Sequence, residues 1–335
     1  MKTVISLPKE LSAGTSAEFT QNLPIIPEHS EVILDGKNLE LIDGTGLMAL
    51  AVFLTHLSES RCRFLVNNLS GQPYKLFSHL GLNGLYCQRK RPKKFNRLAI
   101  KLSALIKRTI DIVVSLGMIS VGFIPGLIIC GLIVADSPGA PLFRQVRVKR
   151  HKRQSYRDLR TPTESDTFAM FKFRTMYKDA EKRTGVITAV ENDPRVTRIG
   201  RFLRRTRLDE LPNFINVLIG DMSIVGPRPD RMKILVDSSK NFPLVFERLR
   251  FVRPGITGLA QLELKSNGTI PEEKQELIDS LPELDRNKPA NEYRFKAYFE
   301  AAYVLGMTSF SVFLKREIYI MLKTPIVMFF KSNVI

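Results

Sequence analysis

A chain of 335 residues, of which 44% are hydrophobic, is long enough for two folded units with real cores, which excludes a mainly disordered protein. Its three cysteines, Cys62, Cys87 and Cys130, are scattered, which excludes a disulfide scaffold and the familiar zinc modules. Residues 1–88 hold 6 Lys and Arg against 8 Asp and Glu, so the net charge of +18 comes from the later residues, which hold 45 against 25. We therefore expect two units, the second of which binds polyanions such as anionic lipid, nucleic acid or phosphorylated substrates.

The first unit, residues 1–88, is predicted to be a small α/β domain. Residues 31–35 and 63–67 are short apolar runs typical of buried strands, and residues 46–57 and 72–80 have the pattern of helices that pack by an apolar side. A basic linker, residues 89–107, is expected next, because this stretch is rich in Lys and Arg and has no acidic residue. The second unit is then expected to run from residue 108 to residue 335.

Residues 112–135 are predicted to enter a membrane, because these 24 residues carry no charge. Pro125 lies in their middle and lacks a backbone donor, so two shorter helices that meet at a bend are expected. Basic residues flank both ends, and positive residues stay on the cytoplasmic side, which favours a re-entrant hairpin. A kinked single span is the alternative, since membrane helices tolerate proline.

Residues 298–330 alternate aromatic and aliphatic runs with Lys315, Arg316 and Lys323. This pattern is typical of interfacial amphipathic helices that lie on a bilayer. Helices that pack into a protein core are the alternative.

The densest block of charged residues is 192–229, and none of the common nucleotide-binding or hydrolase signatures occurs in the chain. Within this block Asp209 and Glu210 are adjacent and follow several arginines, which favour ionised carboxylates at pH 7. An ionised Asp is a nucleophile toward phosphorus, and a neighbouring Glu can hold a hard cation. Acidic residues shortly before Pro212 are also typical of a helix start, and without other motifs this interpretation is the stronger one.

Two further basic clusters suit phosphate groups. Arg228 stands between Pro227 and Pro229, which stiffen the turn and preorganise its guanidinium group. Lys172 and Arg174 alternate with apolar residues, which in a strand puts both on one side. A solvated face or a contact with lipid headgroups is the commoner role of such clusters. No DNA-reading module is present and a membrane segment explains the charge, so nucleic acid is not an expected partner.

From residue 107 onward the chain resembles the bacterial sugar transferase family, the monotopic phosphoglycosyl transferases that start polysaccharide or glycoconjugate assembly on polyprenyl phosphate. The matching motifs are residues 107–111 (Lys-Arg-Thr-Ile-Asp), 137–145 (Ser-Pro-Gly-Ala-Pro-Leu-Phe-Arg-Gln), 172–176 (Lys-Phe-Arg-Thr-Met), 193–195 (Asp-Pro-Arg), 208–212 (Leu-Asp-Glu-Leu-Pro), 216–229 (Asn-Val-Leu-Ile-Gly-Asp-Met-Ser-Ile-Val-Gly-Pro-Arg-Pro) and 253–261 (Arg-Pro-Gly-Ile-Thr-Gly-Leu-Ala-Gln). Together they make a specific match over two thirds of the chain.

The resemblance implies that Asp209 attacks the β-phosphoryl group of a UDP-sugar and releases UMP, after which undecaprenyl phosphate or another polyprenyl phosphate takes up the sugar phosphate. It also implies that Glu210 holds Mg²⁺ against the diphosphate. The residues that the resemblance places at the substrates are Lys172, Arg174, Arg204 and Arg228. A re-entrant helix broken near Pro125 and a site on the cytoplasmic face of the bacterial inner membrane are further implications.

The chain departs from the family pattern around the site. Lys149 stands where the family usually has Gly, and residues 150–167 form a basic, polar insertion. The loop over the site is therefore expected to differ, and the choice of donor with it. Asn213 replaces the usual Gln after the Leu-Asp-Glu-Leu-Pro motif.

The first unit resembles a STAS domain, the fold of anti-sigma factor antagonists, in residues 32–36 (Val-Ile-Leu-Asp-Gly), 41–47 (Leu-Ile-Asp-Gly-Thr-Gly-Leu), 65–68 (Leu-Val-Asn-Asn) and 80–85 (Leu-Gly-Leu-Asn-Gly-Leu). The resemblance implies a regulatory or docking domain with a protein partner. Thr45 falls where the antagonists have a regulatory phosphoacceptor. The alternative, favoured by Gly44 in place of the usual Ser, is that Thr45 caps a helix that starts at Gly46.

Our main hypothesis is therefore an α/β enzyme that joins a STAS-like domain to a membrane-associated phosphoglycosyl transferase domain. The rival hypothesis is a non-enzymatic membrane platform for STAS-mediated protein interaction, against which the intact Asp209 and Glu210 pair argues. The sequence leaves open which sugar is transferred and whether the chain forms a homo-oligomer.

Overall fold

The computed structural model of the chain describes residues 1–83, 93–94, 97–151, 155–159, 161–178, 180, 193–265, 269–283, 285 and 292–330. Its first elements are β1 (Lys2–Ser6), β2 (Glu10–Leu11), α1 (Ser16–Asn22), β3 (Glu31–Asp35), β4 (Leu41–Ile42), α2 (Gly44–Glu59), β5 (Arg63–Asn67), α3 (Gly71–His79) and β6 (Lys93–Lys94). The long helix α5 (Arg97–Asp136) follows, and then the hairpin strands β7 (Leu142–Val148) and β8 (Thr167–Phe173), separated by the 3₁₀ turn η1 (Glu164–Asp166).

The remaining elements are α7 (Arg198–Thr206), η2 (Leu208–Glu210), α8 (Asn213–Ile219), β9 (Ser223–Val225), α9 (Met232–Ser239), η3 (Val245–Leu249), β10 (Gly255–Thr257), α10 (Leu259–Glu263), η4 (Glu272–Lys274), α11 (Gln275–Asp279), α13 (Glu292–Gly306) and α14 (Phe310–Phe330). The predicted mixed α/β fold is therefore confirmed.

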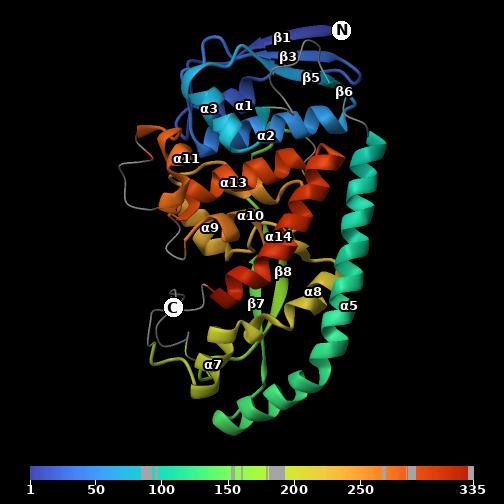
Figure 1. The fold of residues 1–335 in the computed structure, drawn as a ribbon, viewed down its shortest axis with the longest axis vertical. Helices are drawn as coiled ribbons and strands as arrows, with labels where there is room; N and C mark the ends of the chain where they lie inside the picture. The colour runs from blue at the N-terminus through green and yellow to red at the C-terminus, as the bar shows by residue number, and fades with distance from the viewer. Residues whose placement is uncertain are drawn as a thin grey trace.

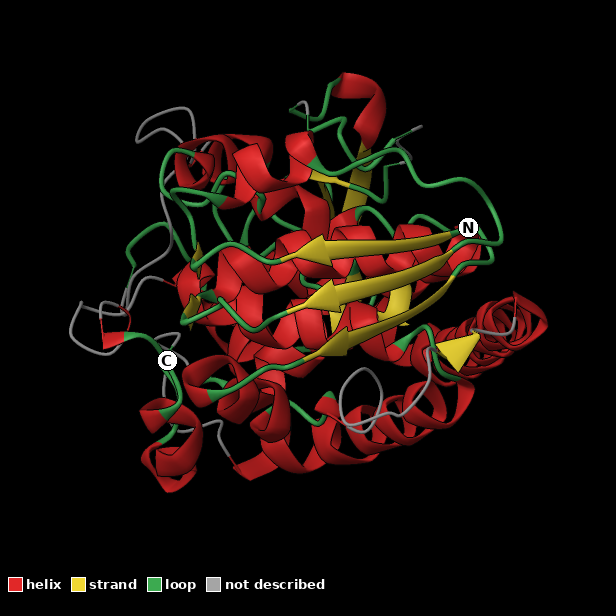
Figure 2. Ribbon diagram, turned by 90° about the horizontal axis from the view of Figure 1, so that it is seen from above, coloured by secondary structure: helices red, strands yellow, loops and turns green. Residues whose placement is uncertain are grey.

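The N-terminal sheet has the strand order β1-β3-β5-β6, with β1, β3 and β5 parallel and β6 antiparallel to β5. Seen from above, the three parallel strands lie over a layer of helices (Figure 2). The predicted strands at residues 31–35 and 63–67 are confirmed with the same bounds. A parallel sheet needs helices on its faces, and α2 supplies the central one.

Helix α2 differs from its prediction at its start and in its burial. It begins at Gly44, and its N-cap is Asp43, whose Oδ1 accepts a hydrogen bond from the Gly46 backbone N–H at 2.8 Å. The prediction that Thr45 caps this helix is therefore wrong. Fourteen of its sixteen residues are buried, because α2 lies between the sheet and α13 and is covered on both sides (Figure 1).

The two predicted units share one hydrophobic core. A single cluster of buried residues runs from Leu34 and Phe53 in the first unit to Tyr298 and Leu305 in α13. The chain between the units is described only at residues 93–94 and from Arg97, so the predicted boundary at residue 88 lies outside the described residues. From Arg97 to residue 107 the predicted linker is helical and forms the start of α5.

Two residues of the insertion at 150–167, Tyr156 and Arg157, pack on the first unit. The ring of Tyr156 contacts the rings of Phe53 and His56 on α2, with centroids 5.2 and 4.9 Å apart. Its hydroxyl donates to the Pro24 carbonyl, and Arg157 donates to the Leu23 carbonyl. Ser155 of the same segment accepts instead from Arg250 of the transferase part. The expectation that the insertion changes the loop over the site stays a prediction.

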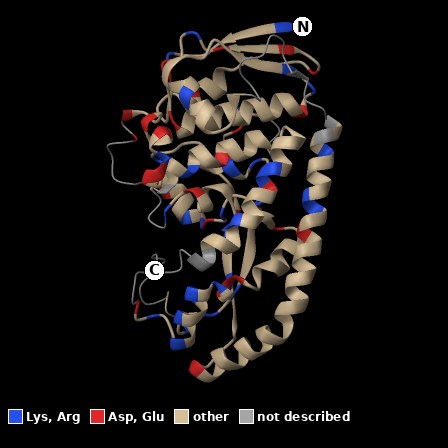
Figure 3. Cartoon of the chain, in the orientation of Figure 1, with Lys and Arg blue, Asp and Glu red and all other residues tan. Residues whose placement is uncertain are grey.

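Helix α5 runs along one side of the molecule and bends in its lower part (Figure 1). Among the described residues, the helical stretch 100–136 alone is long and apolar enough to cross a membrane, with a mean hydropathy of 2.4 in its most apolar window, of which 11% is buried. Figure 3 shows its lower part without charged side chains until its end. The helix continues through Pro125 instead of splitting into two, and its bend is consistent with the predicted re-entrant helix.

The C-terminal helices divide between core and surface. In α13, Tyr298 and Phe299 are buried against α2 and α10, so the predicted interfacial location is wrong for residues 298–306 and the core-packing alternative holds. Helix α14 exposes Ile318, Leu322 and Ile326, which recur every four residues along one face. For α14 the interfacial location stays a prediction.

Candidate active site

The β7–β8 hairpin and one buried amide position Lys172. Strand β8 pairs with β7 along its whole length. Asn216, which is fully buried in α8, donates from Nδ2 to the Ala169 carbonyl at 2.8 Å and accepts at Oδ1 from the Phe171 N–H at 2.9 Å. The amide thus fixes the free edge of β8 and with it the position of Lys172, the next residue.

A tight reversal of the chain after α7 brings Asp209 and Glu210 close to Lys172. Helix α7 packs through Gly200, where a Cβ atom would overlap the Thr175 backbone. The helix ends at Arg207, whose φ of 59° lies in the left-handed region that non-glycine residues rarely adopt. The chain then forms η2, so the two acidic residues lie in a 3₁₀ turn, and α8 starts after Pro212. The predicted helix start is thus correct for Pro212 but not for the acidic residues.

Glu210 is clamped by two cations. Its Oε1 accepts from Lys172 Nζ at 2.8 Å and from Arg228 Nη2 at 3.0 Å. Burial alone would raise the pKa of Glu210, but the charges of Arg228 and Lys172 outweigh it and hold that pKa well below its usual range. The same pairing raises the pKa of Arg228. Glu210 is therefore ionised at neutral pH, as expected.

Asp209 has a different environment from its neighbour. Its side chain is largely buried, and burial followed by the negative charge of Glu210 raises its pKa above the usual value. The positive charges of Lys172, Arg204 and Arg207 oppose this shift. The neighbouring positive charges thus outweigh burial in setting the pKa of Glu210 but not that of Asp209. A carboxylate with a raised pKa is a stronger nucleophile once it has lost its proton.

Arg204 and Arg228 approach the acidic pair from different elements. Arg204, near the end of α7, donates from Nε to Thr175 Oγ1 at 2.9 Å and is close enough to Asp209 for their charges to interact. Arg228 lies in the turn after β9, which is held to β10 by the hydrogen bond from the Gly226 N–H to the Thr257 carbonyl. Long-range contacts therefore gather Lys172, Arg204 and Arg228 around the acidic pair.

Arg174 is not part of this group. Strand β8 ends at Phe173, so the alternation that would have put Arg174 beside Lys172 stops before it. Its guanidinium donates to the carbonyls of Pro138 at 2.8 Å, of Ser137, and of Ile133 and Gly139 at 3.4 Å. These carbonyls lie at and just beyond the C-terminal end of α5, so Arg174 caps that end of the helix.

Arg147 on β7 is a site residue that the sequence analysis did not single out. It donates from Nη1 to the Pro229 carbonyl at 3.2 Å and from Nε to Gln145 Oε1 at 3.0 Å. Burial, and then the neighbouring charge of Arg228, lower its pKa to about 10, so it stays a cation. Gln145 and Arg147 lie two residues apart on one side of a strand, and this spacing is the signal that could have found them.

The long helix α5 is hydrogen-bonded to two elements next to the site, α8 and β9. Arg108 donates to the carbonyls of Val217 at 2.7 Å and Leu218 at 2.8 Å, at the C-terminal end of α8. Asp111 accepts from Ser223 Oγ at 2.9 Å and from the Ile224 N–H at 2.8 Å, on β9. Helix α5 thus holds both α8, which follows the acidic pair, and β9, which precedes Arg228.

The acidic residues of the site could hold Mg²⁺ only together with the phosphates of a substrate. Among the described residues no three His, Cys, Asp or Glu side chains gather as a metal-binding group. Mg²⁺ is often held by one or two carboxylates together with substrate phosphates, and Glu210 provides one carboxylate. Glu210 therefore remains the residue that we expect to hold the ion.

Thr45 lies far from solvent in the assembled fold. Its side chain is only 3% exposed, and it lines a small cavity together with Phe242 and Tyr293. Gly44 before it lies so close to α13 that a Cβ atom would be 2.9 Å from the Arg294 carbonyl. A kinase could not reach the Thr45 hydroxyl in this conformation, which argues against its role as a phosphoacceptor.

Comparison with known proteins matches the transferase part. Residues 102–331 match the family model of bacterial sugar transferases. A 187-residue region is 37% identical to a galactosyl transferase of Streptococcus agalactiae, and spans 50% of this chain and 36% of that protein. A 164-residue region is 38% identical to an exopolysaccharide production protein of Rhizobium leguminosarum, and spans 48% of this chain and 75% of that protein.

A third relative is the UDP-glucose:undecaprenyl-phosphate glucose-1-phosphate transferase of Escherichia coli, 42% identical over 165 residues, which are 48% of this chain and 32% of that protein. The chain thus spans about a third of two of these relatives and three quarters of the other. The family match begins at residue 102, so the resemblance of residues 1–88 to a STAS domain stays a prediction. The matched residues include Asp209, Glu210 and the basic residues around them. The chain belongs to the bacterial sugar transferase family.

Proposed function

We propose that the chain transfers a sugar 1-phosphate from a UDP-sugar to undecaprenyl or another polyprenyl phosphate and releases UMP, as the first membrane step of polysaccharide or glycoconjugate synthesis. Three relatives support this reaction by their names, which specify undecaprenyl phosphate and glucose, galactose or N-acetylgalactosamine phosphate transfer. The observation that carries the proposal is the pair of unlike carboxylates, a buried Asp209 beside a Glu210 clamped by Lys172 and Arg228.

In the first step the ionised Asp209 attacks the β-phosphorus of the donor. A bond forms between its carboxylate oxygen and phosphorus, the bond from phosphorus to the UMP oxygen breaks, and UMP leaves as the anion. In the second step an oxygen of polyprenyl phosphate attacks the same phosphorus and releases the Asp209 carboxylate. One nucleophile thus serves two substrates in turn.

The cations supply the rest of the catalysis. Phosphoryl transfer depends chiefly on positioning and on neutralising the phosphate oxygens. Glu210 Oε1 binds both Lys172 and Arg228 and so holds them together, and Arg204 lies near Asp209. Mg²⁺ held by Glu210 would add charge neutralisation at the diphosphate.

The same structure supports a location at the membrane. The exposed apolar part of α5 suits the bilayer that contains the polyprenyl acceptor. The basic helix α7 lies near the lower end of α5, where it suits anionic headgroups (Figure 3). Basic residues at both flanks of the apolar stretch favour the cytoplasmic face of the inner membrane.

The test is nucleotide release by the purified full chain with Mg²⁺, undecaprenyl phosphate and a panel of UDP-sugars. We expect UMP with one donor or a few, and its loss in Asp209→Asn and Glu210→Gln. Incubation with donor alone should leave the protein heavier by one sugar phosphate, and Asp209→Asn should abolish this adduct. Release of UDP in place of UMP would refute the mechanism.

A further inference from the structure

The turn that carries Arg228 is held at both ends, by different parts of the chain. On one side the Gly226 N–H donates to the Thr257 carbonyl and the Pro227 carbonyl accepts from the Gly255 N–H, each at 2.8 Å, so β10 fixes the start of the turn. The other side is fixed by Arg248, which reaches it from η3.

Arg248 is one of the most deeply buried charged residues in the described chain, with 1% exposure. Its Nη2 donates to the Arg228 carbonyl and to Asp230 Oδ2 at 2.6 Å, and its Nη1 donates to Glu300 Oε1 at 2.8 Å. One planar guanidinium therefore ties the backbone of Arg228 to α13, which carries Glu300. A lysine has a single charged nitrogen at this reach and cannot keep all three contacts.

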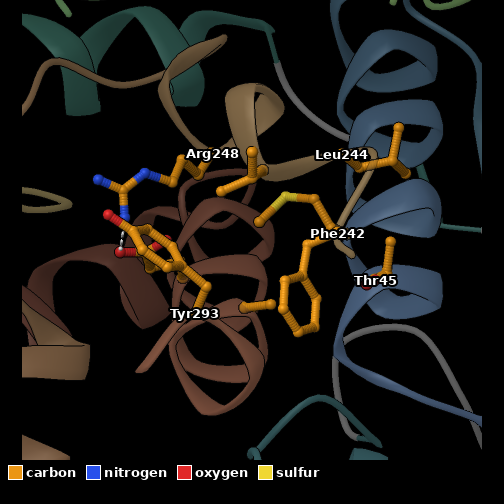
Figure 4. A pocket seen from close by; sticks show the side chains of 9 residues that line it. Thr45, Phe242, Leu244, Arg248 and Tyr293 are labelled. Atoms are coloured by element: carbon orange, nitrogen blue, oxygen red, sulfur yellow. Dashed lines mark hydrogen bonds and ion pairs between the residues drawn. The ribbon is translucent and has the colours of Figure 1, made fainter. Parts of the chain in front are cut away.

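Helix α2 of the N-terminal unit closes the space beside Arg248. A cavity of about 20 Å³ is lined by Thr45 and Met48 of α2 on one side and by Arg248, Tyr293 and Glu300 on the other. Figure 4 shows Thr45 on one side of this cavity and Arg248 and Tyr293 across it, with Phe242 between them. The cavity is too small for a ligand, so its walls act as packing. The N-terminal unit thus packs, through α2, against the residues that surround Arg248.

We propose that Arg248 is a positioning residue for Arg228, and that the N-terminal unit supports this role through the contact of α2 with the cavity beside Arg248. The proposal rests on the proposed function, in which Arg228 binds the diphosphate of the donor. A stiff Pro-Arg-Pro turn transmits any shift of its backbone to the guanidinium, because the prolines allow it little local adjustment. The N-terminal unit is then a structural part of the transferase site.

The first experiment compares Arg248→Lys with Arg250→Lys. Arg250 is also buried, pairs with Glu247 at 2.8 Å and donates to the Ser155 carbonyl at 2.5 Å, away from the Arg228 turn. We expect Arg248→Lys to raise the KM for the UDP-sugar by about tenfold, and Arg250→Lys to leave it unchanged. An equal rise in both variants would overturn the proposal, since it would show a general effect of buried arginine loss.

A double-mutant cycle separates positioning from a general structural role. If Arg248 acts through Arg228, the rise in KM caused by Arg248→Lys should shrink to about twofold or less in an Arg228→Lys background. A rise of the same size in both backgrounds would overturn the proposal. The support from the N-terminal unit is tested by Met48→Ala, which we expect to raise KM by about threefold. Leu50 lies two positions further along α2 and therefore on the opposite side of the helix, so Leu50→Ala should leave KM unchanged.

Hydrogen exchange tests the geometry without any assay of activity. The backbone amides of Gly255 and Val148 donate to the carbonyls of Pro227 and Asp230, on either side of Arg228. They should exchange faster in Arg248→Lys and Met48→Ala than in the wild type, and at the wild-type rate in Arg250→Lys. Unchanged exchange in Arg248→Lys would overturn the positioning role even if the enzyme is active. If the wild type transfers no sugar phosphate from any donor, the proposed function fails, while the exchange result still decides the role of Arg248.

Discussion

The amide of Asn216 offers a sharp test of how the catalytic hairpin is held. The change Asn216→Ala removes the two hydrogen bonds to β8, at 2.8 and 2.9 Å, from a position with no solvent exposure. The Ala169 carbonyl and the Phe171 N–H then lose their partners. We expect Lys172, the next residue on β8, to lose its fixed distance from Glu210.

The magnitude follows from those two bonds. A buried polar group without a partner costs about 1–3 kcal/mol, so two of them and a small cavity cost about 2–4 kcal/mol. For a chain of this size that corresponds to a fall in melting temperature of roughly 5 °C. Displacement of Lys172 should also lower kcat/KM for the UDP-sugar by at least about tenfold, since 1.4 kcal/mol of lost transition-state stabilisation is tenfold in rate.

The assay is thermal unfolding of the detergent-purified chain together with steady-state UMP release. Asn241→Ala is the matched control, because Asn241 is exposed and should change stability by less than about 0.5 kcal/mol. Asn216→Asp should not rescue the variant, since a carboxylate oxygen would face the Ala169 carbonyl. An Asn216→Ala protein as stable and active as Asn241→Ala would refute the idea that this amide holds Lys172 in place.

Three further outcomes are expected. Tyr156→Ala removes a ring buried against α2 and should cost about 3 kcal/mol of stability while leaving the donor KM unchanged; a changed KM would mean that the insertion does act on the site. Arg204→Gln removes a positive charge that opposes the raised pKa of Asp209, so this pKa should rise further. The acid limb of the kcat/KM profile, where activity is lost as the pH falls and Asp209 gains its proton, should therefore move to higher pH; a limb that stays or moves down contradicts the assignment of Asp209. Gly226→Ala puts a Cβ atom into the backbone just before β10 and should lower kcat/KM by at least about tenfold, whereas Gly117→Ala, with open space around it, should not.

The residues with a local signature could be found in the sequence. The strands at 31–35 and 63–67 are short apolar runs, and their bounds follow from the polar residues at their ends. The long apolar stretch predicts α5, although the helix continues through Pro125 where two shorter helices were expected. Asp209, Glu210 and Arg228 stand out because they lie in dense motifs, and the fold brings Glu210 and Arg228 to 3.0 Å. Each of these features depends on neighbours within a few residues.

Other features depend on partners that are far away in the chain. Arg174 and Lys172 look equivalent in the sequence. In the structure β8 ends at Phe173, before Arg174, and the guanidinium of Arg174 donates to carbonyls at the C-terminal end of α5. Asn216 and Arg147 gave no strong signal, because the backbone groups that they bind belong to other elements.

The relation of the two units was likewise decided by tertiary packing. Composition and charge alone divided the chain near residue 88, and the apolar residues of α2 and α13 were each visible as helix faces. Nothing local showed that these two faces cover each other and bury Thr45, because the hydrophobic effect is non-directional and says only that apolar surface will be covered. The sequence by itself determined the short buried strands, the long apolar helix and the motifs that hold Asp209, Glu210 and Arg228, because each has a local pattern. The tertiary structure alone decided which side chains meet, because those contacts join residues far apart in the chain.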